Sequence, residues 1–339
     1  MTLNAFRSLF VGAVLLFAAP TFAQQYTVTY LGKLPGARQS YATAINAGGQ
    51  VVGVSDIGGG TEDWHPFLWT EGTMQDLGQL PGFRQCVPRA INDRGHVIGT
   101  CSGPSSQAFL WTADTGSMAL APPGSEGWGI NNQDDMIGDY TADDGKAHAF
   151  LCRSGEFRDL GNGVAFGIND QGQIVGSAAG PHAALWDEDG QHDLGSLEGS
   201  TSGVSVAFAV SAEGLIVGRS TTGEGSGFYH AVLWTPYGIS NLGTLGTGHD
   251  AAATAISGDL IVGSSNTIPE GDLAALLYDN NGPGYPVNLN DLIPADSGWQ
   301  LTFATGVNAS GQLVGAGGIR DQSGWRAFLL TPVPASTAR

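Results

Sequence analysis

Short apolar segments alternate with polar turns along the whole chain, and this alternation repeats. Each repeat reads as a small residue, Ile or Val, Asn or Ser, a turn containing Gly, two aliphatic residues and a final Gly. The seven copies begin at Ala44, Ala90, Gly129, Gly167, Ala209, Ala255 and Gly306, and they end at Gly53, Gly99, Gly138, Gly176, Gly218, Gly263 and Gly315. A period of roughly 40 to 50 residues built from short strands is typical of proteins in which each repeat forms one small sheet.

The turn inside each repeat indicates how its strands are joined. Asn92-Asp93-Arg94-Gly95 places Asn first and Gly fourth, which favours a type I turn followed by a left-handed glycine between antiparallel strands. A third strand follows, as at His65–Trp69, and a fourth ends in Asp-Leu-Gly, as at Asp76–Gly78. The pattern predicts four antiparallel strands in each repeat.

The two ends of the chain complement each other. Tyr26–Gly32 is similar to a fourth strand that has no repeat before it, whereas no fourth strand follows Leu330. The predicted fold is therefore all-β: a seven-bladed β-propeller of four-stranded blades, closed by the N-terminal strand joining the last blade. An open β solenoid is the alternative, but it requires capping repeats, and neither end has the character of a cap.

The N-terminal segment has the pattern of a signal peptide. Arg7 precedes the apolar run Leu9–Ala19, which is too short to span a bilayer, and small residues follow up to Ala23. A retained anchor is the alternative. We predict a signal peptide at 1–23, a single propeller domain at 24–332 and a short disordered tail at 333–339. The mature protein is expected to be secreted, extracellular or periplasmic, without membrane insertion after cleavage.

Charge and cysteine content narrow the classes of partner. The formal net charge of −18 is spread along the chain, which disfavours binding to nucleic acid and favours a soluble monomer. Cys86 and Cys101 flank one predicted hairpin, so a disulfide is conceivable in an exported protein. The expected turn, however, puts them about one residue out of register, on opposite faces of the sheet. The sequence therefore does not decide whether the disulfide forms.

Several motifs together resemble those of the HAF-repeat extracellular proteins of bacteria. They are the seven repeats, the His-Ala-Phe-Leu-Trp pattern of the third strand, Asp76–Gly82 and its echo Leu31–Gly36, and Leu289–Pro294 followed by Ser297-Gly298-Trp299. The resemblance covers nearly the whole mature chain. It implies an exported repeat protein with a propeller-like fold and no established general activity.

Metal and cofactor sites are not indicated. His65, His148, His182 and His230 occupy one place in different repeats, too far apart to share an ion, so we assign them structural hydrogen bonds. No Cys/His spacing suggests a metal. Asp-rich turns, such as Asp187–Gly190, leave calcium open, although none matches a calcium-binding loop. No cofactor is predicted.

No nucleophile elbow, zinc-binding HExxH or phosphate-binding loop occurs, so we expect that the chain is not an enzyme. Function is expected on the variable loops that join the fourth strand to the first and the second to the third, here called the long-loop face. Its candidate ligand-binding residues are Arg38, Tyr41, Trp64, Arg84, Trp128, Tyr229, His249 and Trp299.

Aromatic residues with arginine suit contact with a polysaccharide or a protein partner. We therefore expect a binding module. A propeller glycosidase or polysaccharide lyase with axial carboxylates is one alternative, and a structural surface or matrix protein is another.

Overall fold

The computed structural model describes residues 26–57, 63–197, 203–223, 228–268, 271–280 and 284–334. The predicted signal peptide 1–23 and most of the predicted tail 333–339 lie outside these residues. Within them, no helix is long and apolar enough to cross a membrane.

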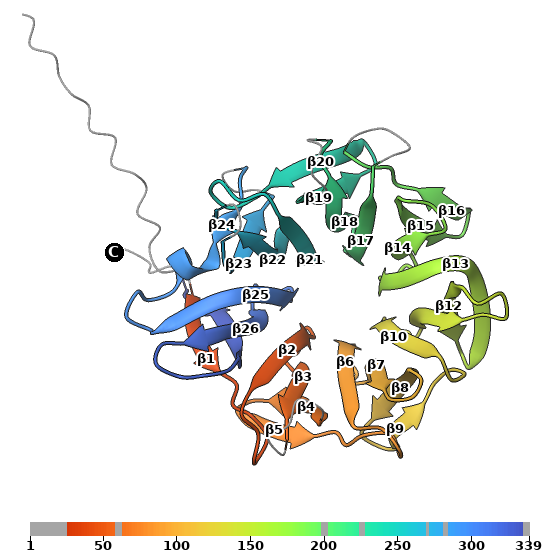
Figure 1. The fold of residues 1–339 in the computed structure, drawn as a ribbon, viewed down its shortest axis with the longest axis horizontal. Coiled ribbons are helices and arrows are strands. Elements are labelled where there is room, and N and C mark those ends of the chain that lie inside the picture. Colours follow the sequence, from red (N-terminus) through yellow and green to blue (C-terminus); the bar gives the residue numbers. More distant parts are fainter. Residues whose placement is uncertain are drawn as a thin grey trace, which may run out of the picture.

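The described chain consists almost entirely of β-strands, which form antiparallel units of four arranged around a centre (Figure 1). Each unit is named here by its innermost strand. The β2 unit contains β2 (Ser40–Ile45), β3 (Val51–Asp56), β4 (Trp64–Thr70) and β5 (Thr73–Asp76). The β6 unit contains β6 (Gln85–Ile91), β7 (Val97–Ser102), β8 (Gln107–Thr112) and β9 (Gly116–Ala119). The β10 unit contains β10 (Ser125–Ile130), β11 (Met136–Thr141), β12 (Ala147–Arg153) and the first half of β13 (Glu156–Ile168).

The remaining units follow the same order from the centre outward. The β13 unit contains the second half of β13, β14 (Ile174–Ala178), β15 (Ala183–Asp187) and β16 (Gly190–Asp193). The β17 unit contains β17 (Ser205–Val210), β18 (Ile216–Thr221), β19 (Tyr229–Thr235) and β20 (Gly238–Gly243). The β21 unit contains β21 (Ala251–Ser257), β22 (Leu260–Asn266), β23 (Leu273–Asp279) and β24 (Val287–Asn288). The β25 unit contains β25 (Trp299–Val307), β26 (Leu313–Ile319), β27 (Arg326–Pro332) and β1 (Tyr26–Tyr30).

The two ends of the described chain meet in the β25 unit. Strand β1 pairs antiparallel with β27, from Tyr26 opposite Pro332 to Tyr30 opposite Phe328. The first and last inner strands are also neighbours, because the Thr305 hydroxyl donates a hydrogen bond of 3.0 Å to the Ala42 carbonyl.

One predicted fourth strand differs from the others. The pattern at Asn288–Asn290 predicts a strand, but β24 has only two residues and leads into the 3-10 helix η1 (Leu289–Leu292). The side chain of Asn288 accepts a hydrogen bond from the Asn290 N–H and caps this helix. Leu289 and Leu292, three residues apart, are both buried in the core between the β21 and β25 units. Their burial favours the helical turn over a longer strand.

A β-bulge in every inner strand explains the final glycine of each repeat. The ladder between the first two strands shifts by one residue, as between Pro88 and Ala90, leaving Arg89 as the extra residue. A Cβ atom added at Gly99 would overlap the carbonyl oxygen of Val87, and one added at Gly138 would overlap that of Glu126. The repeat therefore requires glycine here because the bulged backbone passes too close for any side chain.

The asparagine at the end of most inner strands ties neighbouring units together. The side-chain N–H of Asn46 donates to the carbonyl of Asn92, that of Asn92 to Asn131, and that of Asn131 to Asn169, at 3.0, 3.0 and 3.2 Å. Asn169 donates to the Ser211 carbonyl at 2.9 Å, and Asn308 donates to the Asn46 carbonyl at 3.1 Å. This series is called the asparagine belt. Ser211 and Ser257 occupy its remaining positions.

The repeat histidines make the hydrogen bonds assigned to them. The Nδ1 atoms of His65, His148 and His182 lie 2.9 to 3.0 Å from carboxylate oxygens of Asp76, Asp159 and Asp193, and His230 pairs with Asn241. Each of these partner residues comes from the fourth strand of the same unit. The hydrogen bonds expected of these histidines are confirmed. The repeat tryptophans Trp69, Trp111, Trp186 and Trp234 are buried in the cores between units.

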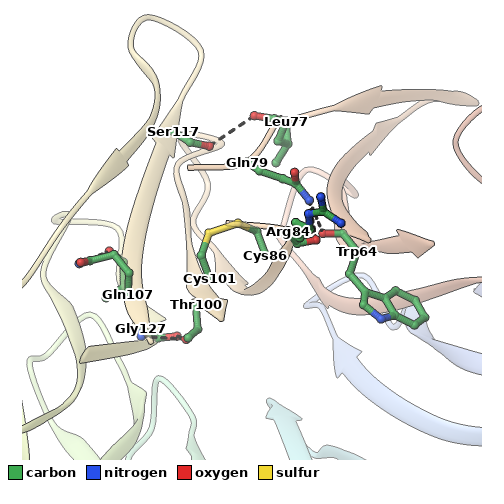
Figure 2. The surroundings of a disulfide bond; sticks show 12 residues. Trp64, Leu77, Gln79, Arg84, Cys86, Thr100, Cys101, Gln107, Ser117 and Gly127 are labelled. Atoms are coloured by element: carbon green, nitrogen blue, oxygen red, sulfur yellow. Dashed lines mark hydrogen bonds between the residues drawn. A yellow bond between two sulfur atoms is a disulfide. The ribbon is translucent and has the colours of Figure 1, made fainter. Parts of the chain in front are cut away.

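A disulfide joins Cys86 on β6 to Cys101 on β7 (Figure 2). The two residues lie directly opposite each other, so the expectation that they are out of register is wrong. The reason is the bulge at Arg89, since one extra residue on β6 moves Cys86 from Ser102 to Cys101 as its partner. Cys152 is buried and free.

The disulfide is expected to contribute strongly to stability. It closes a loop with a sequence separation of 15, for which chain entropy gives roughly 3 kcal/mol. We expect the double variant Cys86→Ala/Cys101→Ala to lose about 2 to 4 kcal/mol of unfolding free energy in urea. Reductant should destabilise the wild type by a similar amount and leave the double variant unchanged. Equal unfolding free energies of the wild type and the double variant in the absence of reductant would contradict this assignment.

The asparagine belt gives a second prediction. Asn92→Ser keeps an acceptor for the turn but removes the amide that reaches Asn131 and Asp134. This substitution is expected to lower the free energy of unfolding by about 1 to 3 kcal/mol, because buried groups lose their hydrogen-bond partners. Ser211→Asn, which introduces an amide where the belt lacks one, should stabilise the protein by up to about 1 kcal/mol. Urea denaturation measures both, and an unchanged midpoint for Asn92→Ser would show that the belt is dispensable.

Candidate functional site

An axial channel runs between the inner strands. On the side of the short hairpin turns, a cavity of about 770 Å³ is lined by the asparagine belt. A second cavity of about 220 Å³ lies farther toward the long-loop face. The two share Ile45, Ile91, Ile130, Ile168 and Val307 as lining residues, so an aliphatic ring separates the two halves of the channel.

The bulge residues form the wall of the second cavity. Because each bulge adds one residue to an inner strand, it directs a side chain into the channel just before each repeat begins. The residues of this kind that line the cavity are Thr43, Arg89, Trp128, Phe166, Phe208 and Thr305. The repeat's own hydrogen bonds do not use these side chains in the β6, β10, β13 and β17 units, so the sequence is free to vary there.

Four of these residues belong to a continuous series of ring and cation contacts, here called the aromatic arc. The Arg89 guanidinium lies 4.5 Å from the Trp128 ring centroid, and the centroids of Trp128 and Phe166 are 5.1 Å apart. Phe166 and Phe208 are 5.7 Å apart, and the Arg219 guanidinium lies 5.7 Å from Phe208 and 4.4 Å from Tyr229. The arc thus crosses from the β6 unit to the β17 unit, with an arginine near each end.

Two carboxylates stand behind the arc in the β10 unit. Glu126 on β10 lies directly opposite Asp139 on β11, and the Trp128 indole N–H donates a hydrogen bond of 2.8 Å to Asp139. Burial raises the pKa of Asp139 to about 6; the Trp128 hydrogen bond opposes this rise, and the charge of Glu126 adds to it. Desolvation in the channel lowers the pKa of the Arg89 guanidinium, and the negative charge of Glu126 partly offsets this. Asp139 is therefore a group of the site that can exchange a proton near neutral pH.

A second aromatic series lies on the long-loop face across the β25 and β2 units. Ring centroids are 5.5 Å apart for Phe303 and Trp325, 5.9 Å for Trp325 and Tyr41, and 5.4 Å for Tyr41 and Trp64. Phe303 and Trp325 also line a groove of about 610 Å³. This series is called the rim cluster.

The structure brings some predicted site residues together and separates others. Tyr41 and Trp64 meet in the rim cluster, while Trp128 and Tyr229 belong to the aromatic arc. Four others lie apart from both groups.

Arg38 and Arg84 are exposed in the loops before β2 and β6, and the Arg84 carbonyl accepts a hydrogen bond from the Trp64 N–H (Figure 2). His249 packs on Phe228, and Trp299 packs on Tyr30 and Phe328. Ligand binding by any of the eight residues stays a prediction.

Several residues of the site are not among those predicted from the sequence, although the sequence contains a signal for them. Arg89, Phe166 and Phe208 each directly precede a copy of the repeat, where other copies have Thr. Arg219 and Asp139 directly follow the final glycine of their repeats, where other copies have small or apolar residues. Alignment of the copies with one another exposes these departures. Trp325 gives no such signal, because it lies in the loop before β27 and its partner Tyr41 comes from another unit.

The acidic turns considered for calcium hold other partners. Asp135 forms an ion pair with Arg153 at 2.7 Å, and Asp187 contacts His192 at 2.9 Å. No group of three or more His, Cys, Asp and Glu side chains suited to a metal ion occurs in the part of the chain that is described.

Asp139 gives a pH-dependent prediction. Its folded-state pKa of about 6 exceeds the ordinary 3.8, so the folded protein holds this proton more tightly than the unfolded chain. The resulting stabilisation is fully present below pH ~4 and is lost as the pH rises through ~6. Asp139→Asn should therefore raise the unfolding free energy at pH 8 by about 1 to 2 kcal/mol and change it little at pH 4. Urea titrations at both pH values measure this, and a gain that is equal at both would refute it.

Comparison by sequence finds no family model that matches this chain and no match among curated proteins. The resemblance to HAF-repeat proteins therefore stays a prediction.

Comparison of the fold finds solved structures that are similar over most of the chain. Puromycin hydrolase (S511A mutant) has a TM-score of 0.55 and 13% identity, over 85% of this chain and 52% of that one. Streptogramin B lyase has a TM-score of 0.53 and 8% identity, over 93% of this chain and 100% of that one. The β-propeller domain of the Trilobed protease from Pyrococcus furiosus has a TM-score of 0.53 and 10% identity, over 87% of this chain and 97% of that one. The chain spans 62% of the length of TolB from Acinetobacter baumannii and about half of puromycin hydrolase.

These likenesses correct one expectation. The lack of a catalytic motif led us to expect that the chain is not an enzyme, but a hydrolase and a lyase have this fold. That expectation is wrong as an inference from missing motifs, and an enzymatic activity stays open. Identities of 8 to 13% show fold alone, since one fold hosts many functions. The chain has the all-β fold of the propeller type, built from four-stranded antiparallel units.

Proposed function

We propose that this protein is an exported, seven-bladed β-propeller that binds a polysaccharide through its long-loop face. The seven repeats and the pairing of β1 with β27 support a ring closed between its two ends. The disulfide supports an oxidising compartment outside the cytoplasm, secreted or periplasmic. The resemblance to HAF-repeat proteins agrees with both.

The aromatic arc is the observation that carries the binding function. Trp128, Phe166 and Phe208 are partly accessible and line the channel, although the repeat does not require aromatic residues there. Aromatic faces pack against the C–H groups of a sugar ring, while arginine and carboxylate groups can hydrogen-bond its hydroxyls. The arc supplies both kinds of group in one cavity.

The shape of the site favours a chain-like ligand over a protein surface. A cavity of about 220 Å³ is smaller than most small-molecule pockets, so it suits one small ring rather than a large group. A stable protein interface requires roughly 800 Å² from each partner. The rim cluster and its groove of about 610 Å³ offer further stacking positions, so a polysaccharide is expected to contact both regions.

Removal of one aromatic ring tests this proposal. We expect Trp128→Ala to weaken binding of a glycan, first identified on a glycan array, by about tenfold in isothermal titration, because roughly 1.4 kcal/mol of stacking is lost. Trp325→Ala should weaken the binding of long oligomers more than that of disaccharides.

Tyr237→Ala is the matched control, because Tyr237 is a fully exposed aromatic residue at the β19–β20 turn on the opposite face. Its affinity should equal that of the wild type. Unchanged affinity of Trp128→Ala would show that the aromatic arc is not the binding site. Failure of the wild type to bind any glycan would overturn the proposed function.

Turnover of the bound glycan is a second candidate, favoured by Glu126 opposite Asp139. Paired carboxylates, one with a raised pKa, are the groups that glycoside cleavage uses. Release of reducing ends by the wild type, abolished in both Glu126→Gln and Asp139→Asn, is the expected result. Binding without any release would exclude turnover and leave the binding function intact.

A further inference from the structure

We propose that the sugar bound by the aromatic arc is acidic, with its carboxylate held by Arg89 or Arg219. This inference rests on the proposed function and specifies its ligand class: a polysaccharide that contains uronic acid. Three features of the two arginines support it, namely their free hydrogen-bonding capacity, their orientation and their departure from the repeat.

Both guanidinium groups have donors without acceptors among the described residues. No hydrogen bond or ion pair involves the Arg89 side chain, and the buried Nε of Arg219 has no partner. Two other arginines of the described chain have several partners: Arg153 binds Asp135 with three contacts of 2.7 to 3.0 Å, and Arg326 donates to three carbonyls. Unsatisfied buried donors are costly, so Arg219 in particular favours an acceptor supplied by a ligand.

The rings hold the guanidinium groups in a useful orientation. Arg89 lies over the face of Trp128, and Arg219 lies between the rings of Phe208 and Tyr229. A guanidinium that stacks on a ring keeps its N–H edge free, and that edge matches the two oxygens of a carboxylate. The same aromatic rings can stack on the apolar face of the sugar. The carboxylate and the ring of one sugar unit are therefore recognised by neighbouring side chains.

The repeat itself does not require either arginine. The positions equivalent to Arg89 carry Thr, Trp or Phe, and those equivalent to Arg219 include Val54, Ser177 and Ala316. The chain also has few cations, with 13 Lys and Arg against 31 Asp and Glu. Arg89 in the channel wall and Arg219 beside Phe208, in so acidic a protein, are therefore complementary to an anion.

The test compares one sugar backbone with and without its charge. Isothermal titration would use tetramers of galacturonate, alginate and hyaluronan, fully methyl-esterified tetragalacturonate, neutral dextran oligomers and dextran sulfate. At least one uronate should bind, and for galacturonate the acid should bind about tenfold or more tightly than its ester. Arg89→Gln and Arg219→Gln should each weaken binding of the acidic tetramer about tenfold, which corresponds to about 1.4 kcal/mol. Binding should also weaken as salt rises.

Arg94→Gln is the matched control, because Arg94 pairs with Asp134 beside the asparagine belt, on the opposite face. Its affinity should not change, and urea unfolding verifies that all variants fold. Preference for neutral or esterified sugar, or uronate binding insensitive to both arginine variants, would overturn this inference while leaving glycan binding intact. Arginine-dependent binding of dextran sulfate alone would overturn the carboxylate assignment. Failure of the wild type to bind any of these sugars or any array glycan would overturn the proposed function itself.

Discussion

One asparagine amide in most units connects local structure to the assembly of the whole. Its carbonyl oxygen accepts backbone N–H groups of its own turn, as Asn92 does from Arg94 and His96, and its N–H donates to the next unit. These side chains are buried, so every lost partner would leave a polar group without compensation. The hairpin turn and the neighbouring unit are therefore fixed by the same residue. Serine at Ser211 preserves only the local half of this arrangement, since its hydroxyl serves the turn alone.

The bulge in each inner strand links this scaffold to the site. Close approach at the bulge demands glycine on the adjacent strand, as at Gly99 and Gly138, and that demand is repeated in every unit. The extra residue, in contrast, projects into the channel without a fixed structural role in several units. Arg89, Trp128 and Phe208 could therefore diverge while the repeat stayed constant. A rigid frame with a few variable inward positions is a common way to place function on a repeat fold.

Similarity of fold says little about chemistry here. Solved structures with this architecture include a hydrolase and a lyase, at identities too low to transfer residues. Function must therefore be inferred from the groups that line the channel or lie beside it: the rings and Arg89 in the wall, and Arg219 and the carboxylate pair next to those rings. The proposed binding and turnover would share Trp128, because its indole N–H donates a hydrogen bond to Asp139.

The sequence by itself determined the strands and the four-stranded repeat, because these follow from local alternation and turn chemistry. It also indicated that the repeat histidines make hydrogen bonds, but only the structure identified their partners, such as Asp76 for His65. It did not determine the register of Cys86 and Cys101, which one bulge residue shifts, or the helical turn at Leu289, which core packing selects. It also missed most of the aromatic arc. Residues some forty positions apart meet there only because adjacent units pack around one axis, and that contact is a property of the tertiary structure.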